Sequence, residues 1–118
     1  LLDRLLKVHR YLEGSGLDAT FTLANRLKDI KGAKPVHDLI VRIATDEIGH
    51  VQFGSKWFAY FCDEKQVSRV SECRKILKAS INDLPYRREP IKENLRLDAG
   101  FLSEEVEVFK GFQQELCI

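Results

Sequence analysis

Hydrophobic residues recur along most of the chain at intervals of three and four, which is the period of an amphipathic helix. Runs that alternate apolar and polar residues between turn signals, as strands do, are missing. We therefore expect an all-α domain in which the glycines of "GSG" at 14–16 separate the first two helices. The predicted helices cover about residues 1–13, 20–30, 35–61, 68–81 and 103–116.

Local signals support several of these helix ends. Thr20 or Thr22 is a suitable cap for the second helix, and Pro35 is a residue that the first turn of a helix tolerates. Ser103 is a suitable cap for the last helix, and the acidic residues at 104–105 favour the positive end of its dipole. The stretch "PYRREP" at 85–90 is a predicted loop.

The long central helix carries a regular seam with two polar members. Its seam positions alternate in spacing between four and three, as in a helix that packs lengthwise in a bundle. They are Val36, Ile40, Ile43, Glu47, His50, Gly54, Trp57 and Phe61. A buried carboxylate costs several kcal/mol unless a partner compensates its charge. The pattern thus predicts a cation beside Glu47 and His50.

The first helix repeats this arrangement. Leu2, Leu6, His9 and Glu13 follow the same spacing, so a second imidazole and a second carboxylate point toward the interior. No lysine or arginine lies on either seam at these levels, and a metal ion would satisfy the groups together. The Glu-x-x-His spacing of 47–50 places a carboxylate and an imidazole on one helix face, and carboxylate-bridged di-iron sites are built from such pairs.

Composition limits the classes of function. The net charge is +1 with both signs interspersed, so a basic face for nucleic acid is not expected. No apolar run approaches the ~18 residues of a membrane span. The three cysteines, Cys62, Cys73 and Cys117, are odd in number and lack a Cys-x-x-Cys spacing, which predicts reduced thiols and a cytoplasmic protein.

Three stretches, "HRYLEGSGLDAT", "DEIGHVQFGSKWF" and "RLDAGF", resemble a bacterial family of ferritin-like proteins of uncharacterised function, related in fold to rubrerythrin and the bacterial tRNA hydroxylase. The resemblance implies a ferritin-like bundle in which Glu13 and Glu47 bind metal, with Glu47 bridging, and His50 is the imidazole ligand. His9 would be a further ligand or support Glu13 from outside the coordination sphere. The expected cofactor is two iron ions, or manganese and iron.

The same resemblance implies that this chain holds only half of the site. Residues 1–62 would supply two of the four bundle helices, and residues 63–118 an additional helical layer of one domain spanning 1–118. The other Glu and Glu-x-x-His would come either from a missing N-terminal helix pair or from a second copy in a homodimer. The start of the chain, which is already helical and uncapped, favours a truncated protein whose own site is empty or partly occupied.

The complete site would make the protein an oxidoreductase, such as a hydroxylase, that activates oxygen or peroxide for an unidentified small-molecule substrate. Two alternatives use the same residues differently. The first is an iron-binding or storage protein, and the second is a helical interaction module without metal.

Overall fold

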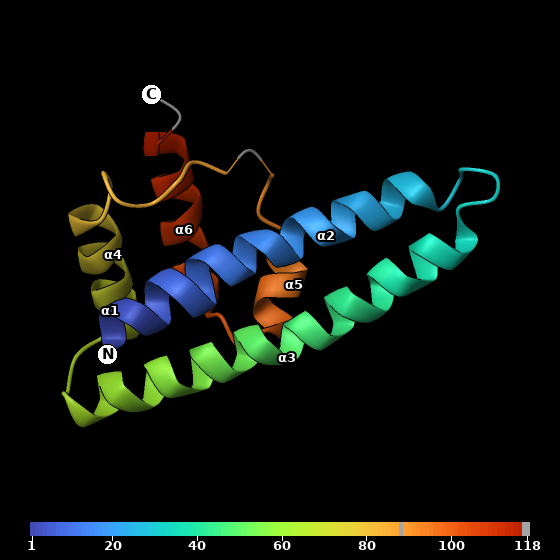
Figure 1. Ribbon diagram of the computed structural model, residues 1–118. Helices are drawn as coiled ribbons and strands as arrows, with labels where there is room; N and C mark the ends of the chain where they lie inside the picture. The colour runs from blue at the N-terminus through green and yellow to red at the C-terminus, as the bar shows by residue number, and fades with distance from the viewer. Residues whose placement is uncertain (88, 117–118) are drawn as a thin grey trace.

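All regular secondary structure described for this chain is helical, which confirms the all-α prediction. The computed structural model describes residues 1–87 and 89–116 (Figure 1). Its elements are α1 (Leu2–Arg4), the π-helix η1 (Leu5–Leu12), α2 (Glu13–Leu27), α3 (Lys34–Glu64), α4 (Arg69–Ala79), α5 (Glu93–Asp98) and α6 (Ser103–Leu116). The bounds of α6 are those predicted, and those of α3 and α4 agree with prediction to within a few residues.

The predicted break at 14–16 is wrong, because α1, η1 and α2 form one continuous helix from residue 2 to 27. Gly14 is buried against the guanidinium of Arg96, and Ser15 donates to the carbonyl of Tyr11 one turn back. The contact with Arg96 favours the helix at Gly14, although glycine by itself costs about 1 kcal/mol there relative to alanine.

The predicted caps of the second helix are also wrong. The hydroxyls of Thr20 and Thr22 donate to the carbonyls of Gly16 and Asp18, four residues back within α2. Threonine side chains in a helix interior often make this bond. The helix ends at Leu27, three residues earlier than expected.

The segment from residue 5 to 12 has wider turns than an α-helix. At its end the amide of Glu13 donates to the carbonyl of Val8, five residues back. Such π turns are rare and occur often at functional positions. A π turn holds more residues than an α turn, so residues spaced three and four apart no longer share one face. Leu2 and Leu6 are buried, whereas His9 and Glu13 are each 30% exposed.

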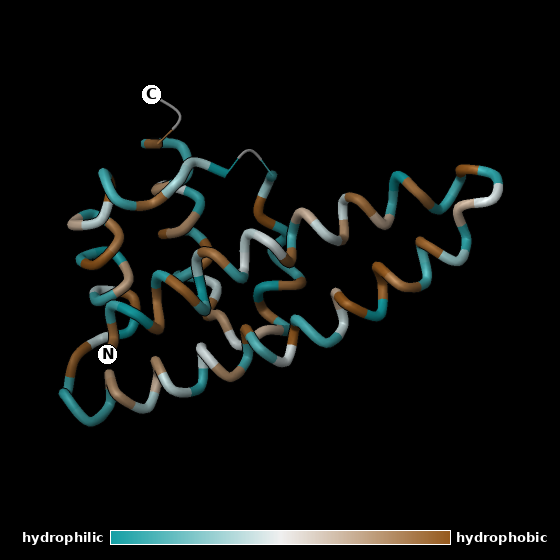
Figure 2. Tube along the Cα trace, in the orientation of Figure 1, coloured by the Kyte–Doolittle hydropathy of each residue, from teal (hydrophilic) through white to brown (hydrophobic). Residues whose placement is uncertain are grey.

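The two long helical segments run antiparallel as a hairpin, and its far end projects beyond the rest of the molecule (Figure 1). Hydrophobic positions alternate with polar ones along this projecting part (Figure 2). Its large exposed hydrophobic residues are Leu23, Ile30, Val36, Leu39 and Ile43.

The predicted seam of α3 is not its buried face in this chain. The buried residues of α3 are Ala44, Val51, Gly54, Ser55, Phe58 and Cys62. Of the predicted seam only Gly54 is buried, whereas Val36 and Ile43 are about half exposed. The hairpin buries the side of α3 that faces the preceding helix, and no element among the described residues covers the neighbouring stripe.

The core lies at the other end of the hairpin. There α4, α5 and α6 pack beside η1 and the second half of α3 (Figure 1). Ser68 caps α4 by accepting a hydrogen bond from the amide of Ser71. Gly100, with φ +90, turns the chain between α5 and α6 in a conformation that residues with a side chain rarely adopt. None of the described helices, α3 included, has an apolar stretch long enough to cross a membrane.

Candidate functional site

His9 and Glu13 form a hydrogen-bonded pair on the first helical segment. The distance from His9 Nδ1 to Glu13 Oε2 is 3.3 Å, and each side chain is 30% exposed. The four-residue separation places both on one helix face. They lie at the margin of the core, where solvent and a ligand can reach them.

Glu47 and His50 form a second pair of the same kind on α3. The distance from His50 Nδ1 to Glu47 Oε2 is 3.0 Å, with Glu47 28% and His50 66% exposed. The expectation that His50 faces the interior is therefore wrong for this chain as it stands. The physical reason is that its stripe of α3 lies uncovered.

The two pairs lie on neighbouring helices at nearly the same height. His9 packs edge-on against the ring of Phe53, with 6.2 Å between ring centroids, and a Cβ at Gly54 would collide with the Cβ of His9. Because the helices run antiparallel, Glu13, one turn after His9, lies at about the level of His50, one turn before Gly54.

The pairs do not merge into one cluster. Among residues 1–87 and 89–116, no three histidine, cysteine, aspartate or glutamate side chains are placed to hold one metal ion. The structure thus brings His9 to Glu13 and Glu47 to His50, each within one helical segment. The assignment of Glu13, Glu47 and His50 as metal ligands stays a prediction.

The strongest polar contacts lie elsewhere, in the core. The guanidinium of Arg10 binds both carboxylate oxygens of Glu105, with 3.0 Å from Nη2 to Oε1, and its Nε donates to Ser55 Oγ at 3.2 Å. The thiol of Cys73 donates to Glu105 Oε2 at 3.1 Å. Arg10 is 1% and Glu105 0% exposed, so this ion pair is fully buried.

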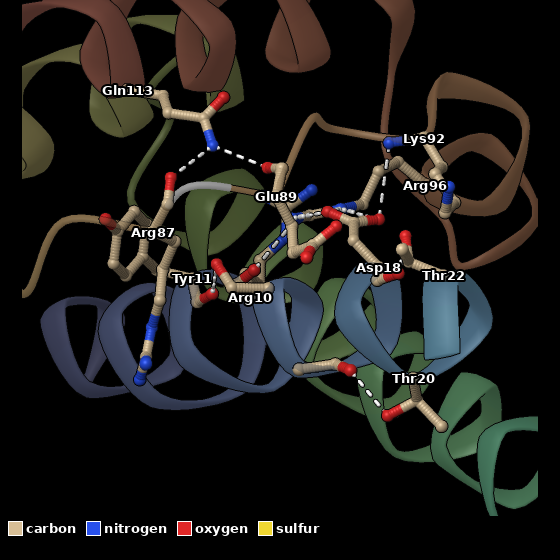
Figure 3. A network of polar contacts seen from close by, with 12 residues as sticks. Arg10, Tyr11, Asp18, Thr20, Thr22, Arg87, Glu89, Lys92, Arg96 and Gln113 are labelled. Carbon is tan, nitrogen blue, oxygen red and sulfur yellow. Dashed lines mark hydrogen bonds and ion pairs between the residues drawn. The ribbon is translucent and has the colours of Figure 1, made fainter. Parts of the chain in front are cut away.

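A second buried ion pair lies beside the first. Arg96 Nη2 donates to Asp18 Oδ2 at 2.8 Å, and Arg96 Nη1 donates to the backbone carbonyl of Arg10 at 3.1 Å (Figure 3). The amide of Lys92 donates to Asp18 Oδ1 at 3.3 Å. The two pairs join the first helical segment to α5 and α6, and no buried side-chain nitrogen or oxygen among the described residues lacks a partner.

The two buried carboxylates respond differently to their surroundings. Burial by itself would raise the pKa of Glu105, but the hydrogen bonds and charge of Arg10, the amide of Leu102 and the thiol of Cys73 outweigh burial and hold the pKa below its usual value. For Asp18, burial outweighs the bonds and charge of Arg96, so its pKa is raised.

The sequence pattern does not reveal this network. It assigns Glu105 to the dipole of the last helix and no cation to either seam, whereas Arg10, the residue after His9, is buried in the core. One signal was available, since Arg10, Asp18 and Arg96 all lie in the stretches that carry the family resemblance. These stretches contain core ion pairs as well as the candidate ligands.

Fold and site together define an all-helical protein in which the pairs His9–Glu13 and Glu47–His50 lie at one height on adjacent antiparallel helices. The chain belongs to the family described as "Protein of unknown function (DUF455)", which it matches over residues 1–107. It is 30% identical over 116 residues to an uncharacterized protein of Haemophilus influenzae, a match that covers 97% of this chain and 38% of that protein. The chain thus spans well under half the length of that relative. No solved structure matches it.

Proposed function

We propose that this chain carries half of a ferritin-like site for two metal ions, iron or manganese and iron, and that the complete protein is a cytoplasmic oxidoreductase acting with oxygen or peroxide. The observation that supports the proposal is the placement of His9–Glu13 and Glu47–His50 at one height on adjacent antiparallel helices.

The chemistry of these groups fits iron or manganese. Carboxylate oxygens and imidazole nitrogens are ligands of both metals. None of the four side chains has a lysine or arginine partner among the described residues. The negative charges of Glu13 and Glu47 are therefore available to an external cation. Each imidazole turns Nδ1 toward its own carboxylate, which leaves Nε2 for a further contact.

The proposed site needs two further helices. A ferritin-like site takes one Glu from each of two helices and Glu-x-x-His from each of the other two, and this chain supplies one of each. The exposed hydrophobic residues beside the pairs, Ile43 and Phe53 among them, support a covering element on this face. That element is either a preceding helix pair in a longer chain or a second copy of this chain.

In the complete site, Glu13 and Glu47 would hold the metals, His50 would bind one of them, and His9 would orient Glu13. The bound metal pair would supply redox chemistry with oxygen or peroxide. The apolar side chains of this face would keep water away from the carboxylates and admit an apolar small-molecule substrate.

Iron binding by the full-length protein tests the proposal. Ferrous iron is added without oxygen, bound iron is counted after gel filtration, and oxygen is then admitted while the near-ultraviolet absorption is followed. We expect about two irons per complete site. Glu47→Gln should lose this binding, while the matched control Glu64→Gln, an exposed position at the end of α3, should keep it.

Other outcomes select the alternatives. Iron uptake far beyond two ions per site, in the full-length protein and in Glu47→Gln alike, would indicate storage. Absence of uptake in the full-length protein would contradict the metal site and favour a metal-free helical interaction module, for which the exposed hydrophobic residues of the α2–α3 hairpin are the supporting observation.

A further inference from the structure

Helices α4 and α6 lie side by side at the end of the molecule away from the hairpin tip (Figure 1). A groove lies between their side chains. Its volume is about 620 Å³. Apolar side chains of both helices form its floor, including Leu77 of α4 and Val108 and Phe112 of α6. The groove is open along its length and lies apart from the histidine–carboxylate pairs.

The two rims of this groove carry opposite charge. The α4 rim contributes Arg74 and Lys78, and the α6 rim contributes Glu104, Glu107 and Glu115. Among the described residues no ion pair joins one rim to the other, and Glu107 pairs only with Lys110 of its own helix, at 3.6 Å. The opposed charges therefore face solvent across the groove.

A glycine opens the α6 side of the groove. Gly111 lies within α6, and a Cβ placed on it would meet nothing within 4 Å. Glycine is less favourable than alanine in an exposed helix interior, so packing within this chain does not account for Gly111. A position without a side chain allows another helix backbone to approach closely.

We propose that this groove binds a second copy of the chain about a two-fold axis parallel to α4 and α6. Such an axis places α4 of each copy along α6 of the other, so the same contact forms twice. The basic α4 rim of each copy then lies against the acidic α6 rim of the other copy, so opposite charges meet in both contacts. The alternative pairing of α4 with α4 would oppose like charges. This inference does not depend on the metal site.

Reversal of each rim tests the interface. We expect sedimentation equilibrium to show a dimer that weakens at least tenfold between low salt and 1 M sodium chloride, as charge screening requires. R74E/K78E and E104K/E107K/E115K should each be monomeric and helical by circular dichroism. An equimolar mixture of the two should form a heterodimer, because both contacts then regain opposite charges. K65E/K75E, with the same charge change at exposed positions outside the groove, should still dimerise.

A second variant tests the groove without changing charge. Gly111→Trp places an indole at the groove, where a Cβ meets no atom of the chain within 4 Å, so the variant should remain folded and become monomeric. Gly111→Ala should keep the dimer. A wild-type chain that stays monomeric at about 100 µM would overturn the proposal. So would a dimer that survives Gly111→Trp and is lost in Ile43→Asp, because that dimer would use the α2–α3 hairpin.

Discussion

Arg10 of η1 and Glu105 of α6 are joined by two parallel hydrogen bonds inside the core, although 95 positions separate them in the chain. The fork of the guanidinium matches both oxygens of the carboxylate, which is the strongest geometry for such a pair. Arg10 Nε also donates to the hydroxyl of Ser55, and the thiol of Cys73 donates to Glu105 Oε2. Helices from both halves of the sequence therefore meet at one buried charge pair.

Loss of one member of this pair should be costly. Glu105→Leu leaves Arg10 charged and unpaired in the core and should lower the free energy of unfolding by about 3–5 kcal/mol. The double variant R10M/E105L should be more stable than E105L, because Arg10 no longer leaves an unpaired charge in the core. Urea denaturation measured by circular dichroism gives both values. A double variant less stable than E105L would contradict this account of the pair.

Stability should fall in acid through Glu105. Its folded pKa lies below the ordinary 4.5, so its contribution is fully present above that value and is lost as the pH falls through the folded pKa. The difference in unfolding free energy between wild type and Glu105→Gln should therefore be constant at neutral pH and shrink in acid. Urea denaturation across an acid series measures it.

Asp18 provides a control of opposite sign. Its folded pKa is raised, so the wild type should gain stability relative to Asp18→Asn as the pH falls. Equal slopes for the two variants would contradict the opposite pKa shifts of Glu105 and Asp18.

Two glycines of α3 should respond oppositely to alanine. A Cβ at Gly54 would collide with the Cβ of His9, so Gly54→Ala forces η1 and α3 apart and should cost about 1–3 kcal/mol. At Gly49 a Cβ meets nothing within 4 Å, so Gly49→Ala should stabilise the helix by about 0.5–1 kcal/mol. Thermal unfolding compares the two, and a stabilised Gly54→Ala would mean that the helices are not this close.

The two described cysteines should be unreactive in the folded chain. Burial raises the pKa of Cys62 to about 11 and also raises that of Cys73, so neither thiol is ionised at pH 8. In Cys117→Ser, which retains only these two, a disulfide reagent such as Ellman's should react slowly without urea and completely with it. Rapid reaction in the folded protein would show that one of the thiols is accessible.

Much of the fold could be predicted from the sequence. The apolar period and the caps predicted α3, α4 and α6, because hydrogen bonds between residues four apart and local end signals decide where such helices form. The break at 14–16 was wrong for the converse reason. Glycine weakens a helix locally, but the contact of Gly14 with Arg96, 82 positions later, keeps this one intact.

The candidate site was predictable only in part. Spacing alone placed His9 with Glu13 and Glu47 with His50, and both pairs form in the structure. Spacing did not show that the face of α3 with His50 is exposed to solvent, since other helices decide which face of α3 is covered. It also did not reveal that Arg10 rather than His9 enters the core, because the π turn of η1 shifts the faces of the first helix.

The sequence by itself determined that this protein is helical, where its longest helix lies and which histidine and carboxylate side chains share a face. These properties follow from contacts within a few residues. Only the tertiary structure decided that Arg10 and Arg96 lie in the core with Glu105 and Asp18. A charge is buried only where a partner meets it, and here each partner comes from a distant helix whose position the local pattern does not contain.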